Sequence, residues 1–169
     1  MEFQLGEKVV YPNHGVGTIE QISQKSLNGQ PEGYYLLRIR SNSMRVIVPF
    51  TSAENVGLRR VAKNREIISV LDFMQNGACE MARNWKWRYK ENCDKMRTGE
   101  LRHVAEVLKI LLTLNQDKAL SFREKKMLER AWQLLVEEIA TVKKSSREDA
   151  EVMLTKVVTK ANLKPLLPN

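Results

Sequence analysis

The chain has 169 residues with a formal net charge of +8, and 43% of its residues are hydrophobic. This apolar content is enough for a folded core, and the length suits one domain or two small ones. The sequence has neither a membrane-length apolar run of ~20 residues nor a signal-like N-terminus, so we expect a soluble, cytoplasmic protein. Two cysteines and two histidines lack the number and spacing of a disulfide framework or a zinc site.

The first 60 residues carry the pattern of short β-strands. Apolar alternation predicts strands at residues 8–11, 16–22, 34–40 and 44–48. Between the second and third of these, Asn28-Gly29 is a hairpin signal. Residues 51–54 offer a Thr and Glu capping box for one helical turn. Four or five short strands in so few residues predict a small, strongly bent barrel of the SH3 or Tudor kind.

From residue 64 the apolar period becomes helical. Asn64 is a candidate cap for a helix that Asn76-Gly77 interrupts, and a second helix is predicted at residues 80–97, ending near Thr98-Gly99. Apolar residues between 101 and 112 indicate a third helix. The residues expected to face the core in the first helix are Ile67, Ile68, Val70, Leu71 and Met74.

Two further helices follow. Ser121 with Glu124 forms a capping box before a long helix. A last helix begins with one of two Ser and acid pairs, Ser145 with Glu148 or Ser146 with Asp149, and is expected to carry Val152, Val157 and Val158.

These elements predict an α+β fold. A small N-terminal SH3- or Tudor-like β-barrel occupies residues 1–60, and a compact C-terminal bundle of four or five helices occupies residues 61–169. The sequence has no internal repeat and no coiled-coil seam, so we expect a monomer.

Residues 84–90 interleave aromatic and cationic side chains. Cations suit phosphates, and flat rings stack on or wedge between bases, so the combination favours a nucleic-acid surface. The alternative is that the rings are core and the charges are solvated. On a helix Trp85 and Tyr89 share one face, whereas Trp87 lies about 200° from Trp85 at ~100° per residue. Because a small domain can bury one face but hardly both, we expect at least one tryptophan to be exposed.

The positive charge concentrates around this stretch. Residues 79–130 hold 13 Lys and Arg against 8 Asp and Glu, as an electrostatic footprint on nucleic acid would. Signs of catalysis are missing: His14 and His103 have no local partner motif, and Gly15-Val-Gly17 lacks the spacing of a phosphate loop. We therefore expect a protein that is not an enzyme and that has no metal site and no cofactor.

Several motifs together resemble the CarD/CdnL family of bacterial transcription regulators, which bind RNA polymerase. The similarity runs collinearly from residue 1 to about residue 160. The motifs that carry it are Phe3-x-x-Gly6-x-x-Val9-Val-Tyr-Pro-x-His-Gly15, Asn84-Trp85-x-x-Arg88-Tyr-Lys90, Gly99 with Val104-Ala-Glu-Val107, and Leu120-Ser121-x-x-Glu124-Lys-x-Met-Leu128. The N-terminal part alone is less specific, because transcription-repair coupling factors share that module.

The resemblance implies two binding surfaces. The family's N-terminal module docks on the polymerase β subunit, partly by edge-strand pairing, and the matching residues are Lys25, Met44, Arg45, Val46, Ile47 and Val48. The family's helical domain contacts promoter DNA at the upstream fork of the transcription bubble. Trp85 matches a tryptophan that wedges into the minor groove, and Arg88 and Lys90, with Lys86 beside them, match a phosphate-binding stretch.

Three positions depart from the family pattern. Relatives often carry an arginine at the position of Ile47, so Arg45 is expected to supply that contact from the same strand face. Lys25 stands where some members have arginine, which keeps the charge but loses bidentate geometry. Trp87 replaces a polar or basic residue, and it is either a second DNA contact or, the interpretation that we favour, domain-interface packing.

The resemblance thus implies a regulator that docks on RNA polymerase and stabilises the promoter open complex. Two other interpretations compete with it. Gly6-x-Lys8-Val-Val and Gly15-Val-Gly-Thr-Ile19 also loosely resemble KOW-type, SH3-like modules of RNA- or ribosome-associated proteins. That alternative leaves the aromatic helix unexplained. A purely structural alternative has the aromatics in the core, and exposure of Trp85 and Trp87 would count against it.

Overall fold

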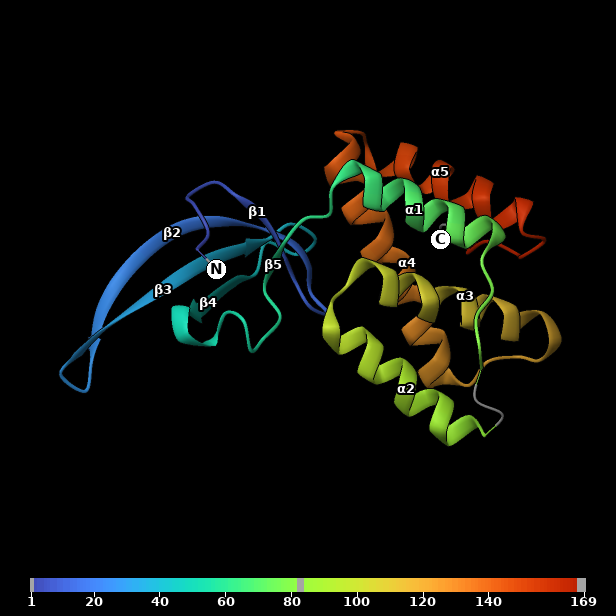
Figure 1. Ribbon diagram of the computed structural model, residues 1–169, viewed down its shortest axis with the longest axis horizontal. Helices are drawn as coiled ribbons and strands as arrows, with labels where there is room; N and C mark the ends of the chain where they lie inside the picture. Colours follow the sequence, from blue (N-terminus) through green and yellow to red (C-terminus); the bar gives the residue numbers. More distant parts are fainter. Residues whose placement is uncertain (1, 82–83, 167–169) are drawn as a thin grey trace. The chain divides into compact units, whose positions relative to one another are not determined.

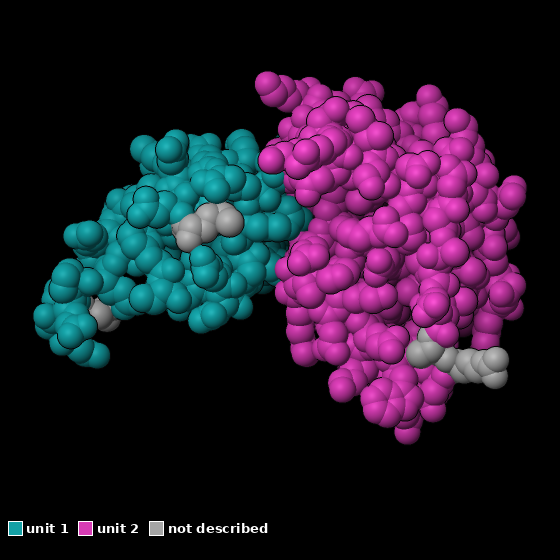
Figure 2. Space-filling view, viewed as in Figure 1, with its two compact units in different colours: residues 1–61 teal, residues 62–169 magenta. Residues whose placement is uncertain are grey.

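The computed structural model describes residues 2–81 and 84–166. The chain divides into two units, residues 1–61 and 62–169, which Figure 2 distinguishes by colour. The change from period-two to helical patterning near residue 61 coincides with this division. Each unit has a hydrophobic core of its own.

The N-terminal unit is built on a five-stranded antiparallel sheet in the order β4-β3-β2-β1-β5 (Figure 1). Its strands are β1 (Lys8–Tyr11), β2 (Gly15–Leu27), β3 (Gln30–Ile39), β4 (Arg45–Pro49) and β5 (Arg59–Arg60). Within the described residues β4 pairs only with β3, and β5 only with β1, so both are edge strands. The four predicted strands are confirmed, and a two-residue fifth strand joins them.

One long hairpin, made of β2 and β3, dominates the sheet. Its turn residues Asn28 and Gly29 have φ of 55° and 80°, a left-handed conformation that these two residue types adopt most readily. Residues 23–27 lack apolar alternation, yet they extend β2 because they pair with β3. A register shift between Ile19 and Gln21 marks a bulge, which bends a sheet. Figure 1 shows β2 and β3 curving together.

The predicted capping box at residues 51–54 is wrong. The turn there is a 3-10 helix, η1 (Phe50–Ser52), which begins after the extended Pro49 and has no side-chain cap among the described residues. The Thr51 hydroxyl instead donates a hydrogen bond to Glu32 Oε1 on β3 at 2.9 Å. The Thr51 side chain is therefore used to attach the turn to the sheet.

The described residues of the C-terminal unit form five helices. They are α1 (Asn64–Asn76), α2 (Trp85–Thr98), α3 (Leu101–Asp117), α4 (Phe122–Lys143) and α5 (Arg147–Lys160). Two predicted start signals are confirmed: Ser121 and Glu124 cap α4, and Ser146 accepts from the backbone N–H of Asp149 at the start of α5. The structure contains no described helix with the length and apolar character needed to cross a membrane.

Helices α1 and α2 both start at positions other than those predicted. Lys63 is the N-cap of α1 in place of Asn64, and the Glu66 side chain accepts from the Lys63 N–H at 2.7 Å. Helix α2 begins only at residue 85, because Asn84 Oδ1 accepts from the Lys86 N–H at 2.9 Å and so caps it there. Residues 80–81 of the predicted helix are not helical, and residues 82–83 lie outside the described part. The predicted end is confirmed, since Gly99 is the C-cap with φ of 67°.

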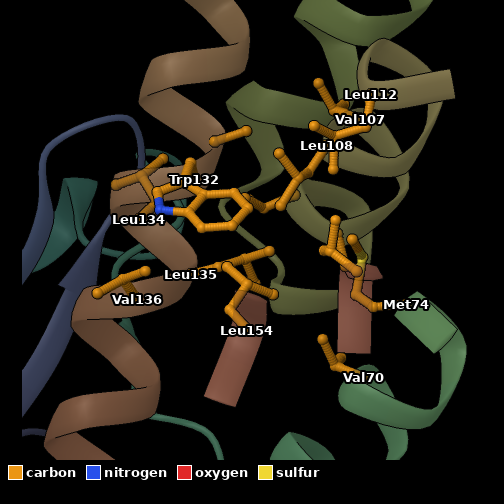
Figure 3. Packing of buried hydrophobic residues seen from close by; sticks show 14 of the residues in the cluster. Val70, Met74, Val107, Leu108, Leu112, Trp132, Leu134, Leu135, Val136 and Leu154 are labelled. Atoms are coloured by element: carbon orange, nitrogen blue, oxygen red, sulfur yellow. The ribbon is translucent and has the colours of Figure 1, made fainter. Parts of the chain in front are cut away.

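The core of the helical unit surrounds Trp132 on α4, which is 2% exposed. Figure 3 shows its indole among leucines of three helices, including Leu108 on α3, Leu135 on α4 and Leu154 on α5. Two residues predicted to face this core do not: Ile68 is 54% exposed and Val152 is 51% exposed. Ile68 lies at the margin of the α1 apolar stripe. Val152 lies about 200° from buried Ala150 at ~100° per residue, on the opposite face of α5.

Two buried charged side chains hold backbone groups in this unit. The Glu138 carboxylate accepts from the Ala62 N–H at 2.8 Å, which fixes the segment that leads into α1. Lys109 Nζ donates to the Phe73 carbonyl oxygen at 2.8 Å, near the end of α1. Burial lowers the pKa of the Lys109 ammonium, as expected for a cation removed from water.

Candidate nucleic-acid interface and edge strand

The first turn of α2 presents two large aromatic rings to solvent. Trp85 and Trp87 are each 61% exposed. The prediction that at least one tryptophan is exposed is confirmed. Within the helical unit the Trp87 ring is as exposed as that of Trp85, and its favoured role in packing at a domain interface stays a prediction. Exposed apolar rings of this size are typical of interaction sites.

Two lysines of the stretch lie over these rings. Lys86 Nζ is 5.9 Å from the centroid of the Trp85 ring, and Lys90 Nζ is 5.6 Å from that of Trp87. Both lysines are exposed. The arrangement places cations that can contact phosphate beside rings that can contact bases.

Arg88 differs from the other predicted DNA-binding residues, because its side chain is only 16% exposed. Its Nη2 lies 3.5 Å from Glu124 Oε1 on α4, and that carboxylate is also largely buried. The Arg88 Nε is buried and has no hydrogen-bond partner among the described residues. Arg88 therefore joins α2 to α4 in this structure, a contact that sequence spacing could not reveal because its partner lies on a distant helix.

The first turn of α4 adds a third exposed ring that sequence reasoning missed. Phe122 is 75% exposed, more than any other large hydrophobic side chain in the described residues. Lys126 Nζ lies 5.5 Å from its ring centroid, and Arg123 Cζ lies 4.8 Å from the ring of Tyr89 on α2. The signal was present in the sequence: the residues three and four positions after Phe122 are both lysine, which places this ring on a polar helix face.

A cavity of about 430 Å³ lies beside Trp85. Its walls come from α2, from the end of α3, and from the first turn of α4 with the segment that leads into it. They include Trp85, Arg88, Leu114, Lys118, Ala119, Leu120, Ser121 and Glu124. The cavity thus combines an aromatic ring and aliphatic side chains with a small number of polar groups.

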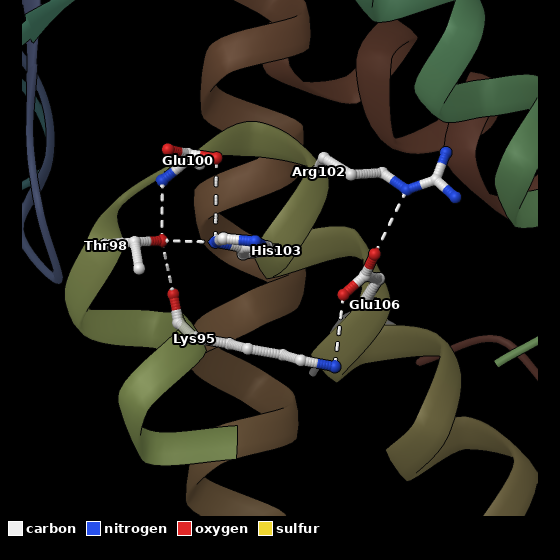
Figure 4. Close-up of polar contacts among 6 residues, drawn as sticks. All are labelled: Lys95, Thr98, Glu100, Arg102, His103 and Glu106. Carbon is white, nitrogen blue, oxygen red and sulfur yellow. Dashed lines mark hydrogen bonds and ion pairs between the residues drawn. The ribbon is translucent and has the colours of Figure 1, made fainter. Parts of the chain in front are cut away.

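A polar cluster fixes the far end of α2 against α3 (Figure 4). Lys95 Nζ and Arg102 Nε lie 3.1 and 3.3 Å from the two carboxylate oxygens of Glu106. Thr98 Oγ1 lies 2.8 Å from His103 Nδ1. Burial alone would raise the pKa of the Glu106 carboxyl, but the hydrogen bond and charge of Lys95, with a hydrogen bond from Arg102, lower it below its usual value. Glu106 is thus held ionised between two cations.

In the sheet unit, the predicted docking residues lie on an edge strand with two distinct faces. Arg45 and Ile47 of β4 share the solvent face, as predicted, and Ile47 is 63% exposed. Val48 is 2% exposed and Val46 packs on the core, so these two can offer a partner mainly their backbone. Met44 precedes the strand and is 37% exposed.

The solvent face of β4 continues onto β3 and β2. Cross-strand pairing sets Arg45 beside Arg38 and Ile47 beside Leu36. Glu20 on β2 forms ion pairs with both arginines, and its Oε2 lies 3.3 Å from Arg45 Nε. The Arg45 guanidinium is therefore oriented by Glu20 while its side chain remains 61% exposed.

Lys25 does not join this group. It lies on β2 opposite Glu32, whereas Arg45 lies opposite Arg38, six residues further along β3. At about 3.3 Å per residue this is roughly 20 Å along the strand. A partner that contacts both Arg45 and Lys25 would need to follow the hairpin over that length.

No three His, Cys, Asp or Glu side chains within residues 2–81 and 84–166 form a group that could hold a metal ion. Glu124 and Glu106, the two carboxylates that contact α2, instead form ion pairs with Arg88 and Lys95. The exposed chemistry of both candidate surfaces is aromatic, aliphatic and cationic, which suits binding to a macromolecule.

Comparison with known proteins gives matches in both units. The model for the CarD C-terminal domain matches residues 69–155, and that for the CarD-like/TRCF RID domain matches residues 3–62. YdeB, a proposed transcription factor of Bacillus subtilis (strain 168), is 36% identical over 141 residues, which cover 83% of this chain and 92% of that protein. A solved structure, CdnLNt from Myxoccoccus xanthus, is 39% identical with a TM-score of 0.31, covering 36% of this chain and 86% of that one.

Proposed function

The chain belongs to the CarD family and is a transcription regulator, and from this premise we propose that it stabilises the promoter open complex. The sheet unit docks on the RNA polymerase β subunit, and the helical unit contacts promoter DNA at the upstream edge of the transcription bubble. The observation that carries the proposal is the pair of tryptophans, each 61% exposed, among cations at the start of α2.

Trp85 is the wedge in this proposal. Closed duplex DNA offers an apolar ring little to contact, whereas an unstacked base step offers an apolar surface of matching size. A ring that binds the open state better than the closed state shifts the equilibrium toward the open state. Lys86, over the Trp85 ring, and Lys90, over the Trp87 ring, provide phosphate contacts on the same helix.

Arg88 has a different role from the phosphate contact that the family resemblance implied. Because its side chain is largely buried against Glu124, we assign it to holding the start of α2 in place. A wedge is effective only if its helix does not yield when the duplex attempts to close, so this support serves the same function.

Docking of the sheet unit uses the β4 edge. An edge strand offers unpaired backbone groups to a partner strand, and Ile47 with Arg45 supplies side-chain specificity beside them. Met44 extends the same contact. The few exposed cations near Trp85 predict weak DNA affinity for the chain alone. Tethering to the polymerase raises the effective concentration of the helical unit at the promoter.

The wedge is tested by the lifetime of open complexes formed with purified RNA polymerase. Trp85→Ala should retain polymerase binding but shorten the lifetime by about fivefold or more, since one base–aromatic contact contributes roughly 1–3 kcal/mol. Trp87→Ala is the matched comparison, because it removes an equally exposed indole from the same helix. An unchanged lifetime in Trp87→Ala would assign the wedge to Trp85 alone, and a shorter one would make Trp87 a second DNA contact. An unchanged lifetime with Trp85→Ala would exclude the wedge role.

The docking surface is tested by charge reversal at Arg45. Arg45→Glu should weaken association with the polymerase β subunit, whereas Lys8→Glu, on strand β1 and away from the β4 edge, should not. Lys25→Glu should weaken the same association only if the partner follows the β2–β3 hairpin as far as Lys25. Loss of DNA binding alone would mean that the roles of the two units are reversed. In a pull-down from lysate with the tagged chain, recovery of ribosomal proteins without polymerase would favour the RNA-binding alternative.

A further inference from the structure

The cavity beside Trp85 has the size and lining of a small-molecule site. Its volume of about 430 Å³ falls within the roughly 300–1,000 Å³ of such pockets. Trp85 forms one wall, and Leu114, Ala119 and Leu120 supply aliphatic surface. The aromatic and aliphatic walls suit a flat aromatic ligand.

The polar groups of the cavity suit the edge of such a ring. Arg88 lines the cavity, and its buried Nε–H has no acceptor among the described residues. Buried donors in folded proteins are nearly always satisfied, and a small shift of the Arg88 side chain would bring this N–H within reach of an acceptor in the cavity. Ser121 and Glu124 line the same space and provide hydroxyl and carboxylate acceptors. A ligand with a ring nitrogen or carbonyl acceptor and an amino donor would complement both.

We propose that this cavity binds one unpaired nucleobase that has left the DNA stack next to the Trp85 wedge. The inference rests on the proposed function, because it is the helical unit's contact with melted DNA that brings such a base within reach. Lys118 lines the cavity as well and supplies a cation for the backbone of the extruded nucleotide. Trapping a base outside the helix opposes duplex closure in addition to the wedge.

The test compares three labelled duplexes by fluorescence anisotropy with the full-length chain at low salt. One duplex is fully paired, one carries a single extrahelical cytosine, and one carries an extrahelical abasic nucleotide at the same place. The cytosine duplex should bind at least about fivefold more tightly than the abasic one, the lower limit for stacking of one base. Ala119→Phe, at an exposed position of the cavity wall, should abolish this preference, and Ala119→Ser should keep it.

Equal binding of the cytosine and abasic duplexes, or no binding of either, would overturn the proposal, as would a preference that survives Ala119→Phe. Loss of polymerase binding by Ala119→Phe, with DNA preference intact, would assign the cavity to a protein side chain instead. The proposed function fails separately, when Trp85→Ala leaves the open-complex lifetime unchanged. Circular dichroism melting of both Ala119 variants verifies that they are folded.

Discussion

Helices α2 and α3 follow one another in the chain but relate to the core in opposite ways. Helix α3 buries nine residues, among them Leu108 and Leu111, which are fully inaccessible. Helix α2 is of similar length and buries two, Asn92 and Met96. It leaves both of its tryptophans in solvent. The two largest aromatic side chains of α2 are therefore not part of the core.

The attachment of α2 explains how it can leave these rings exposed. Near its start Arg88 contacts Glu124 on α4, and near its end Lys95 contacts Glu106 on α3. Polar links of this kind fix position with little apolar burial. Helix α3 is stabilised by burial and α2 is positioned by charges, which leaves its aromatic rings available for a partner.

Truncation of a core leucine gives the largest contrast between the two helices. Leu108→Ala on α3 should lower the free energy of unfolding by about 2–5 kcal/mol, because it removes buried methyl groups and leaves a cavity. Trp85→Ala on α2 should change it by no more than about 0.5 kcal/mol, although it removes a larger side chain. Urea unfolding followed by far-ultraviolet circular dichroism measures both. A large loss of stability in Trp85→Ala would show that the ring belongs to the core.

Removal of the Arg88 partner should have a smaller effect. Glu124→Ala leaves a largely buried guanidinium without its carboxylate and deletes part of the α4 capping box, so we expect a loss of about 1–3 kcal/mol. Glu124→Gln retains hydrogen-bonding atoms but not the charge, and it should lie between Glu124→Ala and the wild type. The same unfolding assay compares them. Equal stability of the wild type, Glu124→Ala and Glu124→Gln would mean that the contact between Arg88 and Glu124 does not hold α2.

Much of the fold follows from local sequence signals. Strand β1, the Asn28-Gly29 turn and the caps Ser121 and Gly99 all lie where their patterns predict, because each depends on neighbouring residues alone. The errors arise where tertiary contacts override local preference. Residues 23–27 become strand because they pair with β3.

The candidate site was predictable in its chemistry but not in its geometry. The helical spacing of Trp85 and Trp87 indicated that at least one tryptophan is exposed, and the structure agrees. Whether an arginine on α2 faces solvent or a carboxylate depends on which helix packs beside it, and the partner of Arg88 is far away in the chain. The cavity beside Trp85 likewise requires three segments to meet. Such features are properties of the packing and carry no local pattern.

The ion pair of Lys95 with Glu106 at the end of α2 should contribute least to the free energy of unfolding, and its contribution should depend on pH. The pKa of Glu106 is lowered in the folded chain, so its stabilisation is complete above its unfolded pKa and disappears as the pH falls through the folded one. At about pH 7 the wild type should exceed Glu106→Gln in unfolding free energy by up to about 1 kcal/mol, as expected for a partly exposed pair. At an acid pH below the folded pKa of Glu106 the difference should vanish. Glu7 in the sheet unit also has a lowered pKa, but it is present in both proteins and cancels in this comparison. A constant difference at both pH values would mean that Glu106 acts by packing and that charge does not position this end of α2.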